Sequence, residues 1–196
     1  MNRQISNRMA AFYDRNILPI YTGKRIVIDT NVIAICSTDS DFLRDFKHIF
    51  SDFPLLLDPI VKLEFLRGSQ TEKLFNGKKE FLEINGFYEM PDHQEIYKRV
   101  YKNSIDVARI YSSHNKPDLK LGDLFIISRL ILYPDYLFLT KDISDFTTML
   151  FNRIGIFSIE HKTIKNPSES LIVEHLCLLQ FNFEKYQSCL KRLQLI

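Results

Sequence analysis

Short runs of mainly apolar residues punctuate this sequence, and three of them end close to an aspartate. The runs are residues 25–28, 54–57, 136–139 and 154–159. They are continuously apolar rather than alternating, which is typical of short strands buried on both faces of a parallel sheet. Asp29 and Asp58 come directly after the first two runs, and Asp142 follows the third. We therefore expect a sheet whose strands carry carboxylates at its carboxyl edge.

Segments with helical periodicity lie between these runs. The predicted helices cover residues 41–50, 58–67, 70–84, 93–112 and 122–132. Asp58 and Pro59 suit an N-cap and a first helical position, and Gly68 ends the same helix. This alternation of strands and helices predicts an α/β fold, a three-layer α/β/α sandwich with a central, mostly parallel sheet.

The two ends of the chain are predicted to add helices to this domain. We expect a helix over residues 4–19 and a long helical region over 168–195, bent near Asn182. The predicted organisation is an N-terminal helical extension (1–24), a core domain (25–160) and a C-terminal helical extension (161–196). The apolar stripe of the last segment is expected to pack on the same domain, and a subunit contact is the alternative.

Composition excludes several classes of protein. The longest apolar stretch, residues 125–139, is interrupted by Arg129, Pro134 and Asp135, so it falls short of the ~20 apolar residues that span a bilayer. The first residues lack the apolar core of a secretory signal. The 3 cysteines are too scattered for a disulfide framework or a Cys–Cys metal motif. The sequence predicts a cytoplasmic protein without a membrane span.

Charge is divided unevenly along the chain, although the formal net charge is only +2. Basic residues outnumber acidic ones over residues 1–25 and 161–196, whereas acidic residues are in excess over residues 26–160. An acidic centre between basic ends is compatible with a cation-binding site flanked by surfaces that attract an anionic partner. Solvated helix faces are the alternative interpretation.

Five carboxylates embedded among apolar neighbours are candidates for a single site. Ligand sites in open parallel sheets form beyond the carboxyl ends of the strands, so strand order is expected to bring these residues to one edge. Asp29 follows the first strand, and Asp142 and Asp145 follow the third. Asp123 begins the helix over 122–132, and Glu64 lies in the helix over 58–67.

Each carboxylate also has a structural interpretation. Turns, helix caps, helix dipoles and ion pairs one helical turn apart all use carboxylates. In these alternatives Asp29 is a turn residue beside a helix cap at Asn31, and Glu64 pairs with Arg67. Asp123 complements the dipole of its helix, and Asp142 and Asp145 form a turn and a cap. Taken together, the convergence of all five favours the functional interpretation.

Converging carboxylates repel one another, and a divalent cation relieves that repulsion. An all-oxygen site suits Mg²⁺ or Mn²⁺ rather than zinc, and the 5 histidines are scattered along the chain. The sequence has no glycine-rich phosphate loop and no GxSxG nucleophile elbow. Asn31 stands where a haloacid-dehalogenase-type phosphatase needs a second aspartate. A carboxylate-bound cation with open water positions suits hydrolysis of a phosphodiester.

Four motifs within residues 25–160 resemble those of the PIN-domain nucleases, and most resemble the VapC-type toxins of toxin–antitoxin pairs. The motifs are Ile26-Val27-Ile28-Asp29-Thr30-Asn31-Val32, Glu64 followed by Arg67-Gly68, Gly122-Asp123-Leu124-Phe125-Ile126-Ile127, and Leu139-Thr140-Lys141-Asp142-Ile143-Ser144-Asp145-Phe146. The resemblance implies a metal-dependent endoribonuclease that acts on RNA with Mg²⁺ or Mn²⁺. It also implies a homodimer and, for a toxin, a small antitoxin protein that blocks the site.

The resemblance further implies roles for individual residues. The catalytic set is Asp29, Glu64, Asp123 and Asp142, and the metal ligands are Asp29, Asp123, Asp142 and Asp145, with Asp118 as an alternative to Asp123. Thr140 and Asn31 are expected to support the site. Candidates for binding phosphate are Lys62, Arg67 and Lys141, joined by Arg3, Arg8, Arg15, Lys24 and Arg25 from the N-terminal segment.

Two other functions stay open at this point. The chain could be a catalytically silent PIN-fold module that binds RNA or a protein partner, and metal binding without cleavage would favour that interpretation. It could also be a nuclease that acts on DNA, because phosphate contacts carry no information about the sugar. Parallel digests of the two polymers would decide between RNA and DNA.

Overall fold

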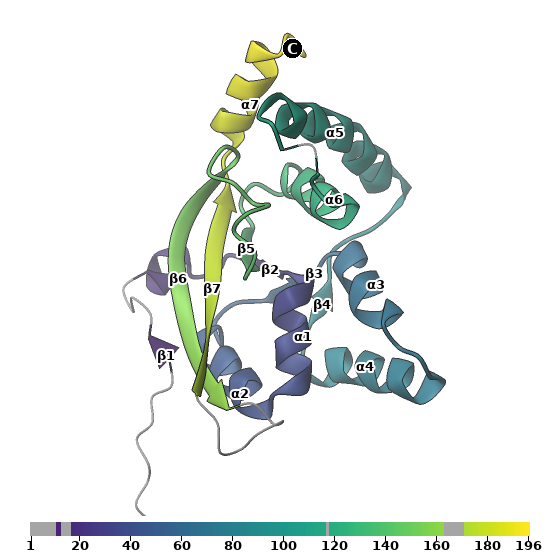
Figure 1. Ribbon diagram of the computed structural model, residues 1–196, viewed down its shortest axis with the longest axis vertical. Helices are drawn as coiled ribbons and strands as arrows, with labels where there is room; N and C mark the ends of the chain where they lie inside the picture. The colour runs from purple at the N-terminus through teal and green to yellow at the C-terminus, as the bar shows by residue number, and fades with distance from the viewer. Residues whose placement is uncertain (1–10, 13–16, 117, 163–170) are drawn as a thin grey trace, which may run out of the picture.

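The computed structural model describes residues 11–12, 17–116, 118–162 and 171–196, which form an α/β fold around one mixed sheet (Figure 1). In this part of the chain the sheet has seven strands in the order β1-β6-β7-β5-β2-β3-β4. Helices pack against the sheet in an arrangement compatible with a three-layer sandwich. The predicted α/β class is confirmed. The half of the sheet from β5 to β4 is parallel, as expected, and the half from β7 to β1 is antiparallel.

The parallel half of the sheet provides the carboxyl edge that the sequence predicts. β2 (Ile26–Ile28) lies between β3 (Leu55–Leu57) and β5 (Leu137–Thr140), and β4 (Tyr88–Glu89) extends the sheet beyond β3. All of these neighbours run parallel to one another. Every residue of β2, β3 and β5 is buried, which explains why their sequences are continuously apolar.

The helices largely follow the sequence prediction. In the described residues they are α1 (Thr30–Thr38), α2 (Ser40–Ile49), α3 (Pro59–Arg67), α4 (Glu72–Ile84), α5 (Gln94–Ser113), α6 (Leu121–Leu130) and α7 (Phe183–Arg192), with a 3-10 turn η1 (Leu18–Tyr21). The positions of α2 to α6 confirm the five predicted helices. The prediction lacks α1, because its short, largely apolar sequence has no polar stripe that would reveal a helical period.

A long antiparallel pair of strands corrects the prediction for the C-terminal segment. β6 (Phe151–Lys162) pairs with β7 (Leu171–Phe181), and β7 also pairs antiparallel with β5. Residues 171–181 are therefore a strand inside the sheet, and the helical prediction over 168–195 holds only for α7 among the described residues. Residues 176–179 are all buried, so this stretch lacks the alternation that distinguishes a strand from a helix. Within the segment 161–196, residues 161–162 and 171–181 belong to the sheet, and α7 is its helical part.

The predicted N-terminal helix over residues 4–19, and with it the helical extension over 1–24, is also wrong where residues are described. β1 (Ala11–Phe12) pairs antiparallel with β6, and η1 follows it. Residues 1–10 and 13–16 lie outside the described residues. The described part of this segment adds an edge strand to the sheet.

The apolar core joins the helices to the sheet. The ring of Phe46 on α2 lies 5.1 Å from that of Phe50, which follows the helix, and the ring of Phe157 on β6 lies 5.1 Å from that of Phe50. All three cysteines are buried and free, in keeping with the absence of a disulfide framework in the sequence. No helix within the described ranges is both long enough and apolar enough to cross a bilayer.

A buried ion pair holds α6 against the start of α3. Nε of Arg129 on α6 lies 2.7 Å from Oδ2 of Asp58, which caps α3, and the two side chains are 5% and 2% exposed. The guanidinium also lies 3.1 Å from a carboxylate oxygen of Asp92. The pair fixes the helix that carries Asp123 relative to the helix that carries Glu64.

Candidate functional site

Asp29 is the buried centre of the candidate site. It follows β2 and caps α1, where its Oδ1 accepts a hydrogen bond from the backbone N–H of Thr30 at 2.7 Å. Its Oδ2 accepts hydrogen bonds from Asn31 Nδ2 at 2.7 Å and from the hydroxyl of Thr140 at 2.5 Å. Burial raises the pKa of Asp29, and these hydrogen bonds oppose that rise. Both residues predicted to support the site therefore contact its central carboxylate.

Two side chains join the loop after β5 to the loop after β2. The hydroxyl of Thr140 donates to Asp29 and accepts a hydrogen bond from the backbone N–H of Asp142 at 2.9 Å. The side-chain oxygen of Asn31 accepts a hydrogen bond from the backbone N–H of Lys141 at 3.1 Å. Because β2 and β5 are parallel neighbours, their carboxyl ends lie side by side, and these short side chains can reach from one to the other.

Glu64 reaches the site from α3. Its Oε2 accepts a hydrogen bond from the hydroxyl of Thr30 at 2.7 Å, a partner that the sequence analysis missed although Thr30 follows Asp29 directly. The Glu64 carboxylate also lies so close to Gly122 that a Cβ there would collide with it. Gly122 thus lets Glu64 approach the first turn of α6, next to Asp123.

Asp123 carries the least compensated charge of the site. Its Oδ2 is buried and has no hydrogen-bond partner among the described residues. Burial is the main cause that raises the pKa of Asp123 from 3.8 to about 7, and the charges of Asp29, Asp145 and, more weakly, Glu64 act in the same direction. Lys120 opposes the rise. These electrostatic interactions indicate that acids from the end of β2, from α3, from α6 and from the β5 loop lie in one site.

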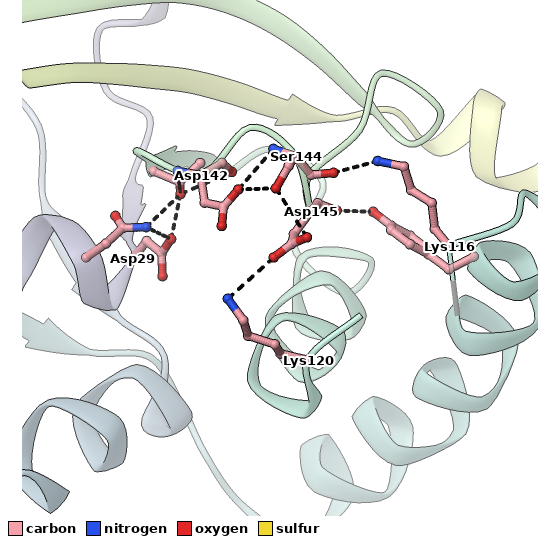
Figure 2. Close-up of polar contacts among 9 residues, drawn as sticks. Asp29, Lys116, Lys120, Asp142, Ser144 and Asp145 are labelled. Atoms are coloured by element: carbon pink, nitrogen blue, oxygen red, sulfur yellow. Dashed lines mark hydrogen bonds and ion pairs between the residues drawn. The ribbon is translucent and has the colours of Figure 1, made fainter. Parts of the chain in front are cut away.

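Asp142 and Asp145 lie on the loop after β5, and Figure 2 shows their carboxylates on the same side as that of Asp29. Oδ1 of Asp142 accepts hydrogen bonds from the backbone N–H and the hydroxyl of Ser144, at 3.0 and 2.5 Å. These hydrogen bonds lower the pKa of Asp142. Asp142 thus forms a turn, as the structural alternative predicts, while remaining next to the buried Asp29 network.

Lys120 is a member of the site that the sequence analysis missed. Its Nζ lies 3.7 Å from Oδ2 of Asp145, and 74% of its side chain is exposed. The negative charges of Asp123, Asp145 and Asp142 raise the pKa of Lys120. Figure 2 shows the side chain extending from the start of α6 toward Asp145. The signal in the sequence was its position three residues before Asp123, which places both on one side of a helix start.

The cations predicted to bind phosphate are mostly engaged elsewhere. Lys62 forms an ion pair with Glu89, Lys141 lies 2.5 Å from Glu174, and Arg67 is exposed in the last turn of α3. In the N-terminal segment, Lys24 lies 3.8 Å from Asp135 and Arg25 donates to the hydroxyl of Tyr136, whereas Arg3, Arg8 and Arg15 lie outside the described residues.

Asp118, the alternative to Asp123, is exposed and lines a pocket of about 240 Å³ beside Asp145, together with Tyr111 and Lys116. The charges of Asp29 and Glu64 act on Asp123. The structure therefore favours Asp123 over Asp118 as the acid that faces the buried centre.

The donor set of the site fits a hard divalent cation in one respect and lacks a closed coordination shell in another. All donors are oxygens, and Asp123 supplies a buried oxygen without a hydrogen-bond partner. Across the described residues, no three His, Cys, Asp or Glu side chains are gathered closely enough to hold a metal ion. The acids thus interact through their charges, without a ready-made set of ligands.

Comparison with models of known protein families gives no match, and comparison with curated proteins finds no related sequence. The resemblance to PIN-domain nucleases therefore stays a prediction that depends on the motif residues and on the site they form.

Proposed function

We propose that this protein is a PIN-like endoribonuclease that depends on a divalent cation and uses Asp29, Glu64, Asp123 and Asp142. The observation that carries the proposal is Asp123, a half-buried carboxylate with a buried, unpartnered oxygen, a pKa raised to about 7, and acidic neighbours. Such an arrangement costs stability, and strongly perturbed carboxylates of this kind concentrate at functional sites.

Each acid has a distinct task in this proposal. Mg²⁺ or Mn²⁺ held by Asp29, Asp123 and Asp142, with Asp145 as a further ligand, would neutralise phosphate charge and lower the pKa of a coordinated water. Thr140 and Asn31 fix the Asp29 carboxylate in one orientation.

Glu64 is the group suited to orient the attacking water. Its Oε2 is held by the Thr30 hydroxyl, which leaves Oε1, the oxygen nearest to Gly122, to accept a hydrogen bond or a proton from that water. Because Glu64 comes from α3 and Asp123 from α6, the water would lie between two rigid elements rather than on a mobile loop.

The proposal is tested by measuring cleavage of single-stranded and structured RNA, and of DNA in parallel, with Mg²⁺, with Mn²⁺ or with EDTA. We expect the parent protein to cut RNA only with a divalent cation, and Asp123→Asn to lower the rate at least ~100-fold. Asp118→Asn is the matched control, because Asp118 is an exposed carboxylate nearby, and it should cleave like the parent.

Three results would contradict the proposal in different ways. Cleavage by Asp29→Asn or Asp123→Asn at the parent rate would remove these residues from the mechanism. Cleavage of DNA in preference to RNA would change the substrate. Cation binding without cleavage across the whole panel would indicate a binding module in place of a nuclease.

A further inference from the structure

Lys120 places a cation at the acidic site. The ammonium of Lys120 lies 3.7 Å from Asp145 Oδ2, and the charges of Asp123, Asp145 and Asp142 act on it. A single ammonium cannot balance this group of carboxylates, so the site keeps a net negative charge with Lys120 in place. Any divalent cation that enters must share the same carboxylates with Lys120.

The position of Lys120 allows it to leave these carboxylates without disturbing the fold. Its residue is the N-cap of α6 but makes no side-chain cap hydrogen bond. Its side chain is 74% exposed, and the ion pair with Asp145 is long. A solvated ammonium on a flexible stem can change partners at little cost. By contrast, Asp29, Thr140 and Asn31 are fixed by several short hydrogen bonds.

We propose that Lys120 is the resting counter-ion of the acidic site, that a divalent cation displaces it from Asp145, and that it then binds a backbone phosphate of the nucleic acid. This inference rests on the proposed function only for its last step. The displacement step concerns cation binding alone. Lys120 thereby supplies the phosphate contact that Lys62 and Lys141, held by Glu89 and Glu174, do not.

A matched control is available on the same side of the site. Lys116 has the same charge and also lies beside the loop after β5, but its ammonium donates to the backbone carbonyl of Ser144 at 2.8 Å (Figure 2). Lys116→Met removes the same charge as Lys120→Met but leaves the ion pair between Lys120 and Asp145 in place. Lys120→Arg keeps the charge at the proposed position.

The first measurement is the affinity for Mn²⁺ alone, by calorimetry or electron paramagnetic resonance at low ionic strength. We expect Lys120→Met to bind Mn²⁺ roughly tenfold more tightly than the parent, because a competing positive charge is gone. Lys116→Met should stay within ~twofold, since its ammonium donates to the Ser144 carbonyl and forms no ion pair with Asp145 in the structure. Lys120→Arg should resemble the parent.

The second measurement is RNA cleavage by the same variants. Lys120→Met should lower kcat/KM roughly tenfold despite its tighter Mn²⁺ binding, and it should reduce the salt dependence of RNA binding by about one phosphate contact. Opposite changes in cation affinity and in cleavage are not expected from a residue with a merely structural role.

The outcomes separate this inference from the proposed function. If the parent cuts no nucleic acid but Lys120→Met alone tightens Mn²⁺ binding, the counter-ion role stands and the nuclease proposal fails. If the parent cuts RNA but Lys120→Met binds Mn²⁺ no more tightly, the counter-ion role is wrong and the nuclease proposal stands. Absence of Mn²⁺ binding in both proteins also overturns the counter-ion role. Unchanged cleavage by Lys120→Met overturns the phosphate contact.

Discussion

Asp29 and Asp58 occupy equivalent places in the fold but are treated differently by their surroundings. Each follows a central parallel strand, caps the next helix with its carboxylate and is at most 5% exposed. Asp58 has a guanidinium at 2.7 Å, from Arg129. The partners of Asp29 are a hydroxyl, an amide and a backbone N–H, and its charged neighbour is Glu64.

This difference identifies Asp58 as the structural carboxylate of the two. The fold is able to place an arginine beside a buried aspartate, and it does so at Asp58, where the pair joins two helices. At Asp29 it leaves the negative charge without such a partner and adds further acids around it. Stability alone would not favour the second arrangement, and the proposed cation would offset its repulsion.

The greatest change in the free energy of unfolding is expected when the ion pair of Asp58 with Arg129 is broken. Arg129→Met should lower the free energy of unfolding by about 3–5 kcal/mol, because it leaves Asp58 buried without a cation. Urea denaturation followed by circular dichroism measures the change. The double variant Asp58→Asn/Arg129→Met should recover part of the loss, since neither buried charge remains. A single variant as stable as the parent would show that the ion pair does not hold α6 in place.

A smaller effect of opposite sign is expected on the functional side. The pKa of Asp123 rises from 3.8 in an ordinary environment to about 7 in the fold. Between these values the unfolded chain has released the proton that the folded protein still holds, so the parent loses stability as the pH rises from 4 to 7. Above pH 7 both states are ionised and the loss is complete.

Asp123→Asn removes this titration, so at pH 8 without divalent cations it should be more stable than the parent by roughly 1–2 kcal/mol. The advantage should shrink toward pH 4. Urea denaturation at pH 5 and pH 8 measures it, with Asp118→Asn as the control, which keeps Asp123 and should follow the parent at both pH values. Asp123→Asn that is less stable than the parent at pH 8 would contradict the electrostatic conflict described for the site.

The smallest expected change in stability separates packing from function within the site. Gly122→Ala directs a Cβ at the Glu64 carboxylate, and that flexible carboxylate can move away. The free energy of unfolding should change by less than ~1 kcal/mol, because alanine favours the helix. RNA cleavage should nevertheless fall, since Glu64 no longer lies beside Asp123. Cleavage at the parent rate would show that the close approach of Glu64 is unnecessary.

The sequence was sufficient for the parts of the fold in which local pattern and tertiary environment agree. β2, β3 and β5 are buried on both faces, so their residues are almost uniformly apolar. Helical periodicity marks α2, α4 and α5, while Asp58-Pro59 and Gly122-Asp123 mark the starts of α3 and α6. β7 was not accessible in this way. Its buried stretch has no alternation, and only the pairing with β5 and β6 makes it a strand.

The site shows the same division. The positions of Asp29, Asp142 and Asp145 follow from their places after β2 and β5, and the rule for parallel sheets brings them together. The contacts of Thr30 with Glu64 and of Lys120 with Asp145 depend on how α3 and α6 pack. Sequence spacing contains no information about that packing. It also does not reveal that Lys62 pairs with Glu89 on β4 and that Lys141 pairs with Glu174 on β7.

The insertion of β7 between β5 and β6 has a consequence for biosynthesis. β5 leaves the ribosome well before β7, so the edge of β5 that includes Thr140 waits for its partner, Cys177, while the rest of the chain is made. Thr140 is also the residue that steadies Asp29. A newly made chain therefore acquires an ordered acidic site only after β7 has emerged and paired with β5.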